Sequence, residues 1–211
     1  MSVAADLWSE NQDLAERART HPFVRGIADG TLPRGTFSSY IAQDTFFLES
    51  FARGYALAVA HSPDRQSLDA FATLLAGVLD ELRLHASYAA ELGIDQQGVR
   101  PRGATLAYCD FLIATASRGV VAHVCAAMAP CMRLYAHLGR ALADGSSAEY
   151  ADWIDTYADS AFEELAATLE RLLDEHADRD DPDDPALSDL YRRAMRLELE
   201  FFDACSPSAP G

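Results

Sequence analysis

Apolar residues recur with the 3.6-residue period of an α-helix along most of this chain, and no run alternates apolar and polar residues as a half-buried strand does. This periodicity predicts an all-α protein. Because the apolar positions do not follow heptads, we expect a globular bundle rather than a coiled coil. The expected helices cover roughly residues 2–19, 33–61, 64–92, 103–118, 120–143, 148–175 (with a candidate break near Ala158) and 186–205, and a short turn or helix covers 21–30.

Glycines, prolines and charged residues mark the expected ends of these helices. Pro33 suits a first helical position, and Gly93 and Gly119 suit positions just after a helix. The acidic, proline-containing stretch 174–185 predicts an exposed connection, and residues 206–211 predict a flexible tail. For a chain of 211 residues we expect one domain over residues 1–205.

The charge balance excludes several classes of function. A net charge of −16 repels phosphate backbones and anionic membrane surfaces, so we expect no nucleic-acid or membrane partner. All 17 basic residues are arginines, and without lysine no side-chain Schiff base can form. No apolar run reaches the ~20 residues of a membrane span, and the first residues lack the pattern of a secretory signal. The expected location is therefore the cytoplasm.

Two acidic residues interrupt otherwise apolar helical faces. Glu198 lies at the centre of one such face, and Asp44 lies at the centre of another. Because burying an unpaired carboxylate costs several kcal/mol, the two acids predict one polar pocket inside the helical core. The faces consist of Leu190, Tyr191, Ala194, Met195, Phe201, Phe202 and Cys205 around Glu198, and of Phe37, Tyr40, Ile41, Phe47, Leu48, Phe51 and Tyr55 around Asp44.

A third polar feature is Cys131, which follows Pro130 inside a helical pattern. Proline removes a backbone donor and clashes with the preceding turn, so we expect the helix to kink or restart there. Free N–H groups at a new helix start would lower the pKa of the Cys131 thiol toward the nucleophilic thiolate. Taken alone, a single helical cysteine is more often buried core filler than a nucleophile, and the four cysteines lack metal-binding spacing.

A set of short motifs occurs in a fixed order between residues 7 and 203: His21-Pro22-Phe23-Val24, Gly30-Thr31-Leu32-Pro33, Tyr40-Ile41-Ala42-Gln43-Asp44, Glu81-Leu82-Arg83-Leu84-His85, Ala107-Tyr108, Pro130-Cys131, Leu134-Tyr135, Trp153-Ile154-Asp155-Thr156-Tyr157 and Leu197-Glu198-Leu199-Glu200-Phe201-Phe202-Asp203. Each motif is weakly specific, but the ordered set resembles the TenA family, the thiaminase II enzymes of aminopyrimidine salvage. The resemblance implies a heme-oxygenase-like bundle of about seven to eight helices that assembles as a homotetramer.

The resemblance also implies which residues form the site. It gives Cys131 the role of nucleophile, Glu198 that of the acid–base group for the pyrimidine ring, and Asp44 that of the carboxylate that binds the ring amino group. The implied substrate-binding aromatics are Tyr108, Tyr135, Tyr157, Phe47 and Phe201. Phe47 departs from the family pattern, because some members carry a tyrosine there, and one polar contact with the substrate is then missing.

The implied activity is the hydrolysis of a small aminopyrimidine, either thiamin or its degradation product aminomethylpyrimidine, with release of hydroxymethylpyrimidine. In this chemistry a thiolate adds to the ring, the leaving group on the exocyclic methylene departs, and water completes the exchange. A carboxyl group beside a ring nitrogen donates and recovers a proton. The reaction implies neither a metal ion nor an organic cofactor.

Two other classes of function stay open. One is a non-catalytic regulatory or ligand-binding protein, and the other is an oxidative enzyme on the same bundle. His21 lies early in the chain, as an axial heme ligand does in a heme-oxygenase-like protein, although a turn or helix cap is the simpler interpretation. Glu81 and His85 lie one helical turn apart, but without a Glu-x-x-His motif we expect a structural hydrogen bond between them rather than a metal site.

Overall fold

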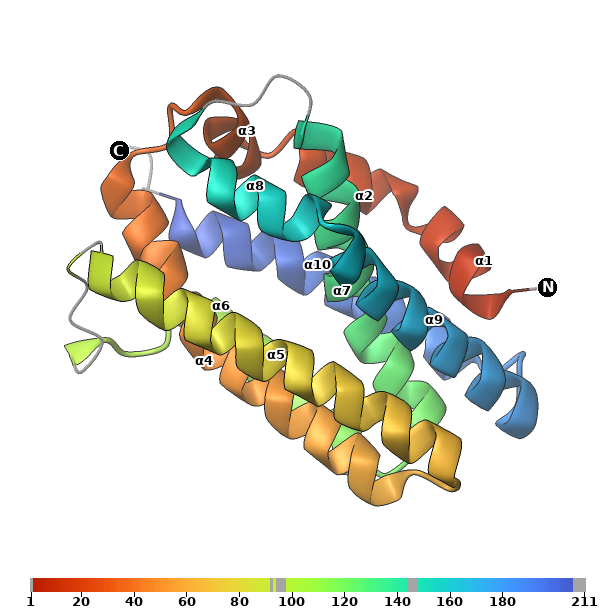
Figure 1. Ribbon diagram of the computed structural model, residues 1–211. Helices are drawn as coiled ribbons and strands as arrows, with labels where there is room; N and C mark the ends of the chain where they lie inside the picture. Colours follow the sequence, from red (N-terminus) through yellow and green to blue (C-terminus); the bar gives the residue numbers. More distant parts are fainter. Residues whose placement is uncertain (1, 92, 94–97, 144–147, 207–211) are drawn as a thin grey trace.

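The computed structural model describes residues 2–91, 93, 98–143 and 148–206. Throughout these ranges the protein is helical and contains no strand, so the all-α prediction is confirmed (Figure 1). None of these helices combines the length and apolar character of a membrane-spanning segment. The helices are α1 (Val3–Glu10), α2 (Gln12–Arg19), α3 (Pro22–Asp29), α4 (Arg34–His61), α5 (Arg65–Glu91), α6 (Gly103–Ala116), α7 (Val121–Ala143), the short 3₁₀ helix η2 (Ala148–Tyr150), α8 (Ala151–Ala158), α9 (Ser160–Asp180) and α10 (Pro185–Cys205).

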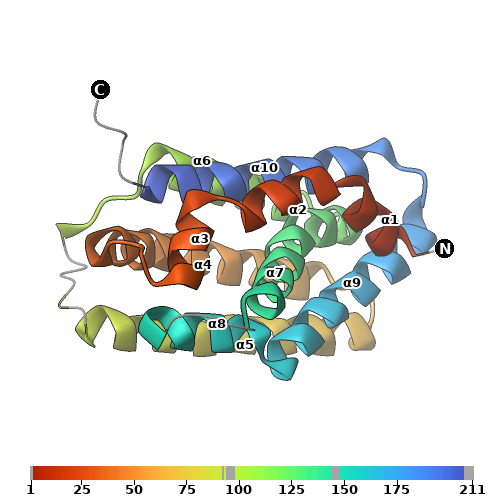
Figure 2. The same cartoon turned by 90° about the horizontal axis from the view of Figure 1, so that it is seen from above.

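The centre of the bundle is α7, which packs against α4, α6, α8, α9 and α10. Figure 2 shows α6 and α10 along one side of the bundle and α5 and α8 along the other, with α4 and α7 between them. The two longest helices, α4 and α5, form an antiparallel pair. This arrangement turns the apolar faces of α4 and α10, with their two acids, toward the same interior.

Several helix ends follow the sequence signals. Gly93 and Gly119, expected just after helices, have φ angles of 66° and 75°, a conformation that costs glycine little because it has no Cβ. His21 caps α3, because its Nδ1 accepts a hydrogen bond from the backbone N–H of Phe23 at 3.1 Å. The expected break near Ala158 is present, and the Asp159 side chain caps the helix that follows.

Two boundaries differ from the predictions. The segment 2–19 forms two helices because Asn11 ends the first: its side-chain amide donates to the carbonyl of Leu7 at 2.8 Å and accepts from Arg192 at 3.0 Å. Residues 174–180, expected in a connection, instead extend α9 to Asp180, because His176 and Ala177 continue its buried face. Residue 92 and most of the expected tail, residues 207–211, lie outside the described residues, and the single domain over 1–205 stays a prediction.

Of the kink or restart expected at Pro130, the restart is wrong, because α7 continues as one helix through this proline. A proline inside a helix costs about 3 kcal/mol. All residues from Val124 to Met132 are buried, so tertiary packing around the proline offsets that cost. Cys131 therefore lies in the middle of a helix rather than at a helix start.

The helices α7 and α8 approach each other closely at Gly139. A Cβ added to Gly139 would lie 2.3 Å from the backbone carbonyl carbon of Tyr157 and 2.5 Å from the nitrogen of Ala158. Because these are backbone atoms, α8 itself would have to move. The absence of a side chain at Gly139 therefore sets how closely α8 packs against the central helix.

We expect Gly139→Ala to lower the free energy of unfolding by about 3 kcal/mol or more through overpacking, although alanine is the better helix former. Urea unfolding would measure the change. Gly35→Ala is the matched control, because nothing lies within 4 Å of the added Cβ, and it should be neutral or slightly stabilising. A Gly139→Ala protein as stable as the wild type would contradict this close approach.

Candidate active site

A small cavity lies inside the bundle, enclosed by side chains from α4, α5, α7, α8 and α9. Its volume of about 10 Å³ is room for roughly one water molecule. Five of the eight predicted site residues line it: Asp44, Phe47, Cys131, Tyr135 and Tyr157. The other three, Glu198, Tyr108 and Phe201, do not line this cavity and pack around the residues that do.

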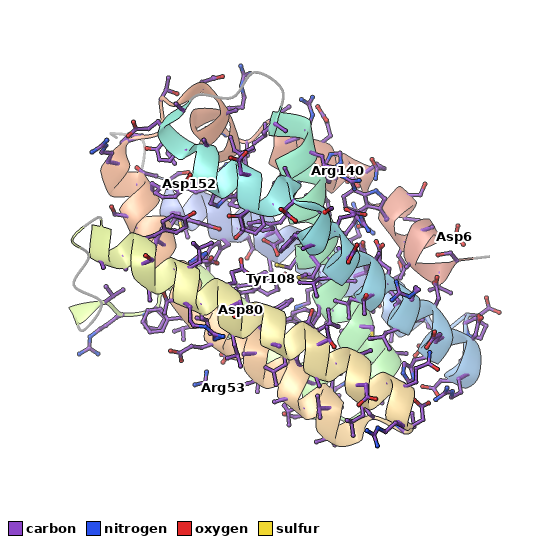
Figure 3. All side chains as sticks on the ribbon, viewed as in Figure 1. Asp6, Arg53, Asp80, Tyr108, Arg140 and Asp152 are labelled. Carbon is purple, nitrogen blue, oxygen red and sulfur yellow. The ribbon has the colours of Figure 1, made fainter. Side chains whose placement is uncertain are left out.

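Glu198 connects the predicted nucleophile to the surrounding helices. Its carboxyl accepts a hydrogen bond from the Tyr108 hydroxyl at 2.7 Å and another from the Cys131 thiol. Burial raises the pKa of Glu198 from 4.5 to about 7, and these two hydrogen bonds oppose the rise. At neutral pH the Glu198 carboxyl group can therefore either donate or accept a proton. Its partner Tyr108 lies in the interior of the bundle (Figure 3).

The pKa of Cys131 is raised well above its usual 9.0, so the expected lowering is wrong. Burial is the largest cause, and the nearby carboxyls of Glu198, Glu81 and Asp44 add to it. Since Cys131 lies inside α7, no free N–H groups of a helix start oppose these effects. The Cys131 side chain is therefore a thiol that donates a hydrogen bond to Glu198.

Asp44 lines the cavity from α4 and is 3% exposed. Burial, followed by repulsion from Glu81 and Glu198, raises its pKa well above 3.8, and a hydrogen bond from Tyr40 opposes the rise. One carboxyl oxygen lies 3.4 Å from Nδ1 of His85, which forms no hydrogen bond. Burial lowers the pKa of His85 to about 4, so the imidazole is neutral.

Glu81 is a site residue that the sequence analysis did not assign. It lines the cavity, and its carboxyl accepts a hydrogen bond from the Tyr157 hydroxyl at 2.7 Å instead of bonding to His85 as expected. Burial raises its pKa from 4.5 to about 7. The signal was present in the sequence, because the buried face of α5 runs through Leu74, Val78 and His85, and Glu81 interrupts it as Glu198 interrupts α10.

Aromatic rings hold these polar groups in place. The ring of Tyr135 packs edge-on against Tyr157, with centroids 4.8 Å apart. Phe47 packs against Tyr108 at 4.7 Å and against Phe201 at 6.0 Å, so Phe201 touches the cavity wall from outside. Such walls suit a flat heterocycle, and Phe47 offers it no hydroxyl.

An outer groove of about 650 Å³ adjoins the cavity and runs between α5, α8 and α9. Three residues line both spaces: Glu81, Met132 and Phe162. The groove also carries Asp80 from α5 and Asp152 from α8, both labelled in Figure 3. A molecule entering the cavity from this side would pass the three shared residues.

The geometry gives little support to a heme site at His21 or to a metal site. Nδ1 of His21 is occupied by the cap of α3, and its Nε2 lies 3.0 Å from Asp203. Within the described ranges no group of three or more His, Cys, Asp or Glu residues is arranged to hold a metal ion. The polar groups that do converge are one thiol, three carboxyls and several tyrosine hydroxyls.

Comparisons with known proteins agree with this fold. The helical bundle superimposes on a heme oxygenase-like domain from Shewanella denitrificans with a TM-score of 0.70, 12% identity and coverage of 95% of this chain and 89% of that one. The protein therefore has a heme oxygenase-like fold. The model of the TENA/THI-4/PQQC family matches residues 8–207, and the chain belongs to that family.

Two relatives are similar over almost their whole length. An aminopyrimidine aminohydrolase of Halalkalibacterium halodurans is 36% identical over 96% of this chain and 95% of that protein. A crystal structure described as a TenA family transcription regulator, from Silicibacter sp. TM1040, matches with a TM-score of 0.92 and 29% identity over 97% of both chains. The names attach an enzymatic activity to one relative and a regulatory role to the other.

The raised pKa of Glu198 predicts a pH-dependent cost to stability. Between pH 4.5 and about 7 the unfolded chain ionises this group while the folded protein keeps it protonated. Wild-type stability should therefore fall through this range relative to Glu198→Gln, by roughly 3 kcal/mol in total. Thermal melts of both proteins across the range would measure the difference.

The matched control for this experiment is Glu200→Gln, an exposed glutamate on the same helix. Its melting curve should follow that of the wild type at every pH. If the difference between Glu198→Gln and wild type did not grow with pH, Glu198 would not be the buried, protonated group described above.

Proposed function

We propose that the protein is a thiaminase II-type hydrolase that releases hydroxymethylpyrimidine from an aminopyrimidine, as part of thiamin salvage. The observation that carries this proposal is the contact between the Cys131 thiol and the Glu198 carboxyl beside a cavity that also contains Asp44. The similarity to an aminopyrimidine aminohydrolase over nearly the whole chain supports it.

Cys131 and Glu198 together supply the nucleophile and its proton transfer. In its carboxylate form Glu198 takes the thiol proton as the sulfur bonds to a ring carbon, and it then gives that proton to a ring nitrogen where negative charge develops. A pKa of about 7 suits both steps near neutral pH. Direct contact between the two groups removes the need for a pre-formed thiolate.

Asp44 recognises the ring edge. Its raised pKa favours the neutral carboxyl group, which has one O–H donor and one carbonyl acceptor. An aminopyrimidine presents the complementary pair, an amino N–H donor beside a ring-nitrogen acceptor. Tyr135, Tyr157 and Phe47 then pack around the flat ring.

Substrate binding requires the cavity to enlarge, because a space of about 10 Å³ does not hold a pyrimidine. Met132 and Phe162 separate the cavity from the outer groove. Rotation of these two side chains joins the spaces, and methionine adapts easily to such changes. The ring then occupies the cavity, and the leaving group projects into the groove.

A regulatory role is the second candidate, because one structural relative is described as a transcription regulator. The net charge of −16 opposes direct DNA contact. An assay of purified protein with thiamin and with aminomethylpyrimidine, following the release of hydroxymethylpyrimidine, separates the two functions. Turnover of either substrate supports the hydrolase, and no turnover of both contradicts it.

We expect Cys131→Ser to lose on the order of 10³-fold or more in kcat while still binding the pyrimidine, because the covalent step is removed but the ring contacts remain. Steady-state kinetics and equilibrium binding would test both parts. Cys125→Ser, on the same helix but outside the cavity, is the control and should keep its activity. Near-normal turnover by Cys131→Ser would rule out covalent catalysis.

We further propose that the protein acts in the cytoplasm, where its four free, buried cysteines stay reduced, and that it forms the homotetramer implied by the family resemblance. Light scattering at micromolar concentration should give about four times the chain mass of 23.0 kDa. A monomer under these conditions would contradict the assembly without affecting the proposed chemistry.

A further inference from the structure

Glu81 occupies the boundary between the cavity and the outer groove. It lines both spaces, as do Met132 and Phe162, and it is the titratable member of these three. The ring-binding groups Asp44 and Cys131 line the cavity but not the groove. A substrate whose ring is held by them and whose leaving group projects outward places its scissile bond next to Glu81.

The position of the Glu81 carboxyl is fixed from the neighbouring helix. The Tyr157 hydroxyl donates to one carboxyl oxygen at 2.7 Å, and the Tyr157 ring is held between Tyr135 at 4.8 Å and Phe162 at 5.0 Å. The second carboxyl oxygen is left for a ligand. Burial raises the pKa of Glu81 to about 7, so the group carries a proton in part of the population at neutral pH.

The groove beyond Glu81 suits a basic or cationic leaving group. Its walls carry the carboxylates Asp152, Asp155 and Asp159, together with Asp80, which pairs with Arg83 outside the lining, and none of the described residues that line it is an arginine. Attraction to a thiazolium falls off slowly in such a partly enclosed space, and the same carboxylates accept hydrogen bonds from the N–H groups of a neutral amine. The charge of the groove therefore matches the leaving groups of both candidate substrates.

We propose that Glu81 is a second catalytic acid of this site, which protonates the leaving nitrogen when the substrate is an aminomethylpyrimidine rather than thiamin. The inference rests on the proposed hydrolase function and assigns the two proton transfers to different carboxyls. Glu198 serves the ring nitrogen, and Glu81 serves the leaving group.

The proton balance differs between the two substrates. When the amine is bound in its neutral form, the carbon–nitrogen bond breaks, its electron pair stays on nitrogen, and the Glu81 proton converts the departing group into neutral ammonia. The Glu81 carboxylate then recovers a proton from the water that adds to the methylene carbon. When a thiazolium leaves, the same electron pair neutralises its positive charge, and no proton is needed.

Glu81→Gln tests this difference. We expect kcat/KM for aminomethylpyrimidine to fall about 100-fold or more, the usual effect of losing a general acid, and kcat/KM for thiamin to fall less than about tenfold. Because kcat/KM reports the steps up to leaving-group release, the later attack of water does not affect the comparison. Equal losses for both substrates, or no loss for the amine, would overturn the proposal.

Asp69→Asn is the matched control, because Asp69 is an exposed acid on the same helix outside the groove. Its kcat/KM for each of the two substrates should equal that of the wild type. If Glu81→Gln does not fold, wild-type enzyme with a series of leaving amines provides the test. Proton donation predicts a weak dependence of kcat/KM on amine basicity, and a steep fall with basicity would refute it. If the enzyme turns over its substrate and needs Cys131 to do so, but one of these contrary results is found, only the role of Glu81 is rejected. If neither substrate is turned over, the hydrolase function itself is rejected.

Discussion

The hydrogen bonds from Tyr108 to Glu198 and from Tyr157 to Glu81 join four different helices, and each holds a carboxyl group inside the bundle at 2.7 Å. Burial alone would push both carboxyls further toward the neutral form, and the tyrosine hydroxyls oppose that shift. The result is two glutamates with pKa values near 7 close to the same thiol. The proposed chemistry depends on this balance between burial and hydrogen bonding.

Much of the fold could be predicted from local patterns, because helix periodicity and glycine or proline boundaries are properties of short segments. Glu198 and Asp44 were recognisable for the same reason, since each interrupts an apolar face of its own helix. The extension of α9 was missed because His176 finds its partner, Ser67, more than a hundred residues away. Contacts between residues so far apart in the chain cannot be predicted from a short stretch of sequence.

The electrostatics of Cys131 show the limit of local reasoning most clearly. The proline before it predicted a helix start and a lowered thiol pKa, whereas burial and acids on α4, α5 and α10 raise it. Three of these contributions come from distant parts of the sequence. Glu81 was overlooked for a related reason: it was expected to form a structural hydrogen bond with His85 one turn away, while its actual partner, Tyr157, lies on another helix.

The close crossing at Gly139 has a consequence for how the site tolerates change. Gly139 lies eight residues after Cys131 on α7, roughly 12 Å along the helix axis, and it touches the backbone of Tyr157 on α8. The separation between the thiol and the tyrosine hydroxyl is thus set by steric contact across helices rather than by the chain segment that connects them. A side chain added at Gly139 would therefore disturb the proposed catalytic groups from outside the cavity, because Gly139 itself does not line it.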